Sequence, residues 1–220
     1  MRKQTVPLLL IALALVMLVT LASLVGLGWW YFRRDRSIPV DLVRICNGKV
    51  TESTSFVGGN DNLNTLEEFP VGTNTFAGVR FAVNGVIQLN GRYPDIASGI
   101  RIERKCRQLH LLHGAAGKQP DGTTIAKIVA HYANGLTEEF PLLYGRHVRD
   151  WWYRPGNKLP DPESIVAWRG QNKLTRKEGA QLMVYRSSFK NPRPSTRITA
   201  VDFVSLNTGC WPFFLGFTLE

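Results

Sequence analysis

The amino-acid sequence predicts an all-β fold, an antiparallel β-sandwich of the jelly-roll type, preceded by one N-terminal transmembrane helix. Three observations support this prediction. Residues 7–32 include no charged side chain. Beyond them, short apolar runs are separated by Gly, Pro and Asn turns, which is typical of sandwiches and barrels. Helical periodicity is nearly absent from the same part of the chain.

The uncharged segment, residues 7–32, has the properties of a membrane span. Its 26 residues suffice, at ~1.5 Å per residue, to cross a ~30 Å hydrocarbon core with some tilt. Trp29, Trp30 and Tyr31 stand at its end, and bases flank it on both sides. The alternative is a cleaved signal peptide, whose apolar region is about 7–15 residues before a small-x-small site. This segment is longer, and no good Ala-x-Ala site closes it, so we expect an uncleaved signal anchor.

Both flanks of the anchor are basic, so the positive-inside rule does not decide its orientation. A short N-terminal tail ahead of one long domain favours an inside N-terminus and an outside C-terminus. We therefore expect a single-pass protein of the cell membrane, held in the lipid bilayer by its N-terminal helix. Its domain would be extracytoplasmic, either periplasmic or extracellular.

The organisation expected is an anchor with basic flanks over residues 1–36, a linker over 37–44 and one domain over 45–220. That length allows a sizeable core. The net charge is +10, but the bases are scattered, with no long Lys/Arg run after the anchor. We interpret this as a solvated basic surface beside an anionic membrane, and we expect no nucleic-acid partner.

Cys46, Cys106 and Cys210 are far apart and show no Cys-x-x-Cys spacing. Thiolate ligation of a metal is therefore not expected. If the domain lies outside the cytoplasm, one pair of them could form a disulfide bond. Otherwise they are small buried thiols.

Two hairpins are predicted from Asn-Gly pairs, which favour the positive φ angles of tight β-turns. In the first, residues 76–83 precede Asn84-Gly85 and residues 86–89 follow. In the second, Asn134-Gly135 joins residues 125–132 to residues 136–143. Apolar and polar side chains alternate through residues 125–132, which indicates a strand with one buried face.

The remaining strands follow from short β-rich runs bounded by turn residues. They are expected at residues 100–104, 108–113, 165–168, 181–187, 198–206 and 213–219. The polar stretch 174–179 is expected to be a loop or a single helical turn.

The sequence shows no constellation of nucleophile, base and orienting group, so an enzyme is not expected. His110 and His113 are three residues apart and would face opposite sides of a strand. Glu138 and Glu139 also face opposite ways, whereas a glycosidase needs two converging carboxyl groups. Motifs of hydrolases, metalloproteases and P-loops are absent.

The stretch of residues 144–153 is the strongest candidate for a binding site. It includes Arg146, Arg149, Asp150, Trp151 and Trp152. Flat aromatic faces beside planar hydrogen-bonding groups suit sugar rings and their hydroxyls. The alternative is structural, with the tryptophans closing one end of the sandwich and Asp150 pairing with Arg146 or Arg149. Because neighbouring residues on an extended segment face opposite ways, one tryptophan should enter the core and the other face the loops.

A second candidate lies in the stiff crossover formed by Pro192 and Pro194. Asn191 and Arg193 either point at a ligand or hold the turn. The sequence alone leaves both interpretations open.

Several motifs, taken in order over residues 41–220, resemble galactose-binding-like β-sandwich modules attached to bacterial glycan-active and surface-anchored proteins. They are Asn62-Leu63, Phe69-Pro70-x-Gly72, Phe76-Ala77-Gly78-Val79-x-Phe81, Leu109-His110-Leu111-Leu112-His113-Gly114, Tyr132-Ala133-Asn134-Gly135, Tyr144-Gly145-x-x-Val148-Arg149-Asp150-Trp151-Trp152, Ala167-Trp168-x-Gly170-x-Asn172 and Asn191-Pro192-x-Pro194. The chain departs from the family in its three cysteines and in having no catalytic domain beside the module.

The resemblance implies a jelly-roll fold, carbohydrate binding without catalysis and, in some members, a structural Ca²⁺. We therefore expect a membrane-anchored module that recognises a glycan at the cell envelope. The alternative is a structural or protein-interaction module of an envelope complex.

Overall fold

The computed structural model describes residue 17 and residues 36–52, 63–89, 93–161 and 163–220. The chain divides into two units, Met1–Arg36 and Ser37–Glu220, and every element described below lies in the second. No helix within the described ranges is long and apolar enough to span a membrane. The predicted anchor lies outside those ranges except for Met17, and Asn62 of the resembling motifs lies outside them as well.

The second unit is all-β, with a single short helix, α2 (Lys173–Lys177), among its described residues. The strands are β1 (Ile38–Pro39), β2 (Gly72–Phe76), β3 (Val79–Val83), β4 (Ile87–Gln88), β5 (Ile96–Arg104), β6 (Gln108–Ala116), β7 (Thr124–Tyr132), β8 (Thr137–Leu143), β9 (Trp152–Tyr153), β10 (Ser164–Gly170), β11 (Gln181–Lys190), β12 (Ile198–Ser205) and β13 (Trp211–Leu219). Each predicted strand other than 76–83 falls on one observed strand.

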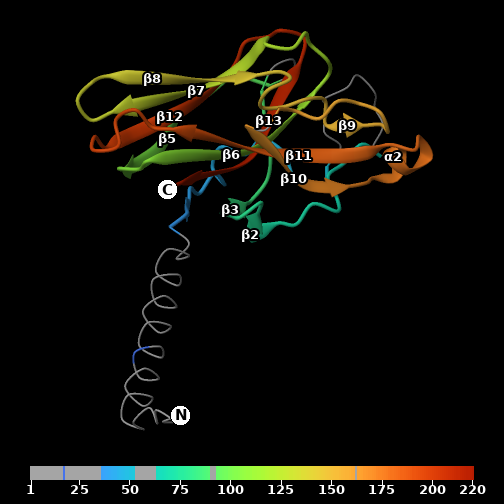
Figure 1. Cartoon of the computed structure of the whole chain (residues 1–220), viewed down its shortest axis with the longest axis horizontal. Coiled ribbons are helices and arrows are strands. Elements are labelled where there is room, and N and C mark those ends of the chain that lie inside the picture. The colour runs from blue at the N-terminus through green and yellow to red at the C-terminus, as the bar shows by residue number, and fades with distance from the viewer. Residues whose placement is uncertain (1–16, 18–35, 53–62, 90–92, 162) are drawn as a thin grey trace, which may run out of the picture. The chain divides into compact units, whose positions relative to one another are not determined.

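The strands form two main sheets, and all their pairings are antiparallel. The seven-stranded sheet has the order β1-β13-β6-β11-β10, with β4 also paired to β13 and β9 to β11. The four-stranded sheet has the order β5-β12-β7-β8, and β2 with β3 forms a separate hairpin. Figure 1 shows the four-stranded sheet at the left of the domain and β9 with α2 at the right. The predicted antiparallel all-β arrangement is confirmed.

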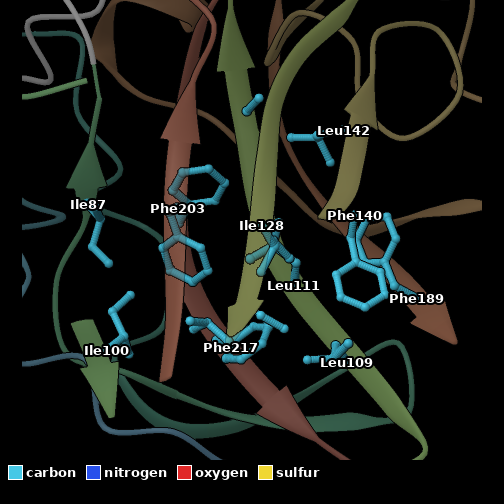
Figure 2. Close-up of a cluster of buried hydrophobic side chains, with 14 of the residues drawn as sticks. Ile87, Ile100, Leu109, Leu111, Ile128, Phe140, Leu142, Phe189, Phe203 and Phe217 are labelled. Atoms are coloured by element: carbon cyan, nitrogen blue, oxygen red, sulfur yellow. The ribbon is translucent and has the colours of Figure 1, made fainter. Parts of the chain in front are cut away.

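The first core lies between the two main sheets (Figure 2). Leu109 and Leu111 on β6 and Phe217 on β13 meet Ile128 on β7 and Phe203 on β12. Burial alternates along the second half of β7, as predicted, because only one face of its sheet is covered.

A second core covers the opposite face of the seven-stranded sheet. There Leu112 and Phe213 pack with residues of the β2–β3 hairpin, including Phe81, and with Trp151. The central strands β6 and β13 are thus buried on both faces, so almost every side chain along them is buried. This explains their mostly apolar sequences, which lack the alternation of a half-buried strand.

The first predicted hairpin is wrong, because its turn lies at Ala77-Gly78 and not at Asn84-Gly85. The run 76–83 is divided by Ala77 and Gly78, which have φ angles of 47° and 83° and connect β2 to β3. Strand β4 pairs with β13 and not with β3. Gly85 allows the backbone to pass close to Gly48, since a Cβ at position 85 would lie 2.8 Å from the backbone oxygen of Gly48. Asn-Gly therefore marks a close backbone approach here.

The second predicted hairpin is confirmed, with a different turn geometry. Strands β7 and β8 pair from Thr124↔Leu143 to His131↔Thr137. The N–H of Gly135 donates to the carbonyl of Tyr132, and Gly135 has a φ of 81°. Asn134 is not among the residues with positive φ, so the turn is of type I followed by a left-handed glycine.

All three cysteines are free thiols. Burial raises the pKa of Cys46 to about 11 and that of Cys210 to about 12, and it raises the pKa of Cys106 in the same direction. These thiols are therefore protonated at neutral pH and poor nucleophiles.

Candidate functional site

A pocket of about 180 Å³ opens beside β11, where the β6–β7 loop meets two segments that flank β9. These two segments are the connection from β8 to β9 and the loop after β9. The lining residues are Lys118, Tyr144, Arg149, Asp150, Trp152, Tyr153, Asn157, Lys158 and Tyr185.

The connection from β8 to β9 is fastened to the seven-stranded sheet by its backbone. The N–H of Trp151 donates to the carbonyl of Ala115 on β6 at 2.8 Å, and the carbonyl of Trp151 accepts from the N–H of Met183 on β11 at 2.8 Å. Asp150 forms an isolated bridge with the same Ala115. These contacts fix which side chains of the connection face the core and which face the pocket.

Trp151 and Trp152 consequently face opposite ways, as the alternation predicts. Trp151 is fully buried in the second core and meets the Phe213 ring edge to face at 5.5 Å. Trp152 is half-buried and lines the pocket, where its Nε1 donates to Asn64 Oδ1 at 3.3 Å. Trp151 is therefore a core residue, and Trp152 is available to a ligand.

Asp150 is the one carboxylate among the lining residues. Burial raises its pKa, while the backbone N–H groups of Trp152 and Gly117 oppose the rise. The Trp152 N–H donates to Asp150 Oδ1 at 3.2 Å. Two tyrosine hydroxyls contact the Asp150 backbone: Tyr144 accepts from its N–H and Tyr185 donates to its carbonyl, each at 3.3 Å.

The predicted pairing of Asp150 with Arg146 or Arg149 is wrong. Arg149 instead makes two hydrogen bonds to Asp121, at 2.8 and 2.9 Å. Arg146 pairs with Glu163 at the surface, with 2.6 Å between Nε and Oε2. Sequence spacing missed both acids because they lie in other loops, far along the chain from the arginines.

Of the four aromatic rings that the described residues contribute to the pocket lining, three have an arginine guanidinium over the ring. The Arg149 guanidinium lies 5.7 Å from the centroid of Tyr144, and Arg154 lies 5.6 Å from that of Trp152. Arg169 lies 5.9 Å from the centroid of Tyr153. Such contacts hold the rings in place and cover part of their faces. A sugar ring in the pocket would contact the parts that the arginines leave open.

The other predicted site residues, Asn191 and Arg193, lie at the β11–β12 turn and do not line the pocket. Asn191 is buried and holds this turn. Its Oδ1 accepts from the Tyr132 hydroxyl at 2.5 Å and from the Arg193 N–H at 2.9 Å, and its Nδ2 donates to the Cys106 carbonyl at 2.9 Å. Of the two interpretations left open by the sequence, the turn is the one observed for Asn191.

The substitution Asn191→Ala should lower the free energy of unfolding by about 2 kcal/mol. It removes three hydrogen bonds and leaves the buried Tyr132 hydroxyl and the buried Cys106 carbonyl without these partners. Chemical denaturation of the variant measures the loss. Ligand binding at the pocket should be unchanged, and a variant that loses binding while keeping its stability would contradict this assignment.

The pocket also uses residues that sequence reasoning did not select: Lys118, Asn157, Lys158 and Tyr185. Asn157 and Lys158 lie in the Pro/Gly/Asn-rich loop that follows the aromatic stretch, which was a usable signal. Lys118 and Tyr185 reach the site only through the pairing of β6 with β11. No local pattern indicates such a contact.

The histidines do not form a second site. His110 and His113 point to opposite faces of β6, where His110 contacts Ser188 and Glu220 and His113 contacts Ser187. Burial lowers the pKa of His113 to about 3, so its ring is neutral. Within the described part of the chain, no three His, Cys, Asp or Glu side chains gather to hold a metal ion.

Comparison with models of protein families found no match to this chain, and comparison with curated proteins found none either.

Proposed function

We propose that the domain is a non-catalytic glycan-binding module with the jelly-roll fold of galactose-binding-like proteins, and that the pocket is its sugar site. Residues 7–32 would hold it in the cell membrane, with the domain on the extracytoplasmic side. The observation that carries the proposal is the composition of the pocket. Trp152 and Tyr153 offer aromatic surface beside the hydrogen-bonding groups of Asp150 and Asn157.

The size and the chemistry of the pocket support the same function. At about 180 Å³ it is smaller than a drug-sized ligand pocket and suits one sugar residue of a longer glycan. Asp150 is the one carboxylate in its lining, whereas most glycosidases use two. Burial raises the pKa of Tyr144 and of Tyr185, so their hydroxyls stay neutral near pH 7.

A glycan array probed with the full-length protein tests the proposal. The detergent must lack a sugar headgroup, since a glycoside detergent would compete for the pocket. Binding to a defined set of glycans is the expected result. No binding across neutral and acidic glycans would contradict it and favour the structural or protein-interaction alternative.

The substitution Trp152→Ala should weaken glycan binding roughly 2- to 10-fold, because aromatic packing contributes about 0.5–1.5 kcal/mol beyond buried area. Titration calorimetry with a glycan from the array measures the dissociation constant, and thermal unfolding measures stability. Trp211→Ala is the matched control. Trp211 is also half-buried against the second core but does not line the pocket, so its removal should leave affinity unchanged. Equal losses in the two variants would place the binding site elsewhere.

A further inference from the structure

We propose that the pocket selects sugars that carry an anionic group, such as a carboxylate or a phosphate, over their neutral parent sugars. This inference rests on the proposed glycan-binding function and specifies its ligand class. It comes from the charges that line the pocket and from which of them are already paired.

The lining includes three bases, Lys118, Arg149 and Lys158, and the single acid Asp150. The charge of Arg149 is offset, because its guanidinium forms a two-bonded ion pair with Asp121. Lys118 and Lys158 form no ion pair with any residue in the described ranges. Two ammonium groups therefore remain beside one carboxylate.

The two lysines are more exposed than Asp150, which favours an anion near the rim of the pocket. Lys118 and Lys158 are exposed, whereas Asp150 is half-buried and has its Oδ1 engaged by the Trp152 N–H. Lys118 comes from the β6–β7 loop and Lys158 from the loop after β9, so the two approach the pocket from different segments. An anionic substituent held by them would gain charge-assisted hydrogen bonds, which a neutral hydroxyl makes only in weaker form.

The acids that pair with the surrounding arginines lie outside the pocket lining, so they do not reduce the excess of positive charge that the two lysines give it. Arg154 lies over the Trp152 ring and pairs with Glu178. Glu178 is not part of the lining, and neither is Asp121.

The charges of Lys118 and Lys158 also act on nearby acids. Burial raises the pKa of Asp150, and the charge of Lys118 opposes this rise. The hydrogen bonds from Arg149 lower the pKa of Asp121, and the charge of Lys158 adds to this lowering. Neither lysine forms a direct ion pair with these acids, so an incoming anion would not have to break one.

The test compares matched sugars by titration calorimetry with the full-length protein in a sugar-free detergent. The neutral probes are the methyl glycosides of glucose and galactose. The anionic probes are the methyl glycosides of glucuronic and galacturonic acid and of the 6-phosphates of glucose and galactose. Comparing uronides with phosphates shows which anion the pocket prefers. Inorganic phosphate is included as an anion without a sugar ring.

We expect the anionic sugars to bind about 10-fold more tightly than their neutral parents at low salt. Lys118→Met and Lys158→Met should each remove most of this preference, so that the anionic sugar and its neutral parent bind with similar affinity. Lys105→Met is the control, since Lys105 is an exposed lysine between β5 and β6 that does not line the pocket.

Equal or tighter binding of the neutral glycosides would overturn the anionic preference and leave the glycan-binding proposal standing. A preference that survives in both lysine variants, or that Lys105→Met removes as well, would also overturn it. Inorganic phosphate that binds as tightly as the sugar phosphates would show an anion site without sugar recognition. Failure of every sugar probe, together with an unreactive glycan array, would overturn the proposed function itself.

Discussion

Trp151→Ala is expected to lower the free energy of unfolding by about 3–5 kcal/mol, the usual range for truncating a buried tryptophan. The side chain is fully buried in the second core, and its ring packs edge to face on Phe213. Its removal leaves a cavity that the neighbouring strands cannot close, because Trp151 hydrogen-bonds through its backbone to both β6 and β11. A domain with a typical stability of about 5–15 kcal/mol would lose a large part of it.

Chemical denaturation followed by circular dichroism measures this loss. Trp151→Phe is the second variant, because it keeps an aromatic ring and should fold even if the alanine variant does not. Trp152→Ala is the comparison, since Trp152 is half-buried at the pocket. Equal destabilisation by Trp151→Ala and Trp152→Ala would contradict the division between a core tryptophan and a pocket tryptophan.

Gly114→Ala is expected to cost about 2–3 kcal/mol, at the upper end of the range for overpacking a core. Gly114 lies opposite Phe213 in the β6–β13 pairing, and a Cβ at this glycine would lie 2.2 Å from the ring atom Cζ of Phe213. Phe213 is fully buried and cannot move aside freely. The cost is purely steric, since Gly114 is not among the residues with positive φ.

Gly216→Ala on β13 is the matched control for this prediction. Its Cβ would lie 3.1 Å from Phe81 Cδ1, a contact that a small shift relieves, so it should cost less. Combining Gly114→Ala with Trp151→Phe should be less costly than the sum of the two, because the smaller ring gives Phe213 room to move. Strict additivity would show that Phe213 does not mediate the cost.

Local patterns predicted most of the strands because each strand has its own signal. The alternation of β7 and the turn at Gly135 follow from neighbouring residues, and the structure contains both. The turn at Asn84-Gly85 failed because the same dipeptide also suits a close backbone contact, here with Gly48. A sequence pattern does not distinguish these two uses of glycine.

The candidate site could be predicted only in part, because several of its residues come from segments far apart along the chain. The stretch 144–153 contributed Arg149, Asp150 and Trp152 to the pocket. Lys118 and Tyr185 come from other segments, which strand pairing alone brings close. The acids that pair with the arginines could not be predicted either, since Arg149 and Asp121 are 28 positions apart. Spacing rules describe neighbours along the chain and cannot describe these contacts.

The double covering of the seven-stranded sheet has a consequence for how such a domain can evolve. Neither face of its central strands meets solvent, so almost any change there disturbs a core. The pocket is instead assembled from loops fastened to the sheet by main-chain hydrogen bonds, which do not depend on side-chain identity. Mutations at Lys118, Asn157 or Lys158 can therefore alter ligand preference while the scaffold persists. Diversification of specificity should accumulate in these loops, with the interior sequence held nearly constant by selection for folding.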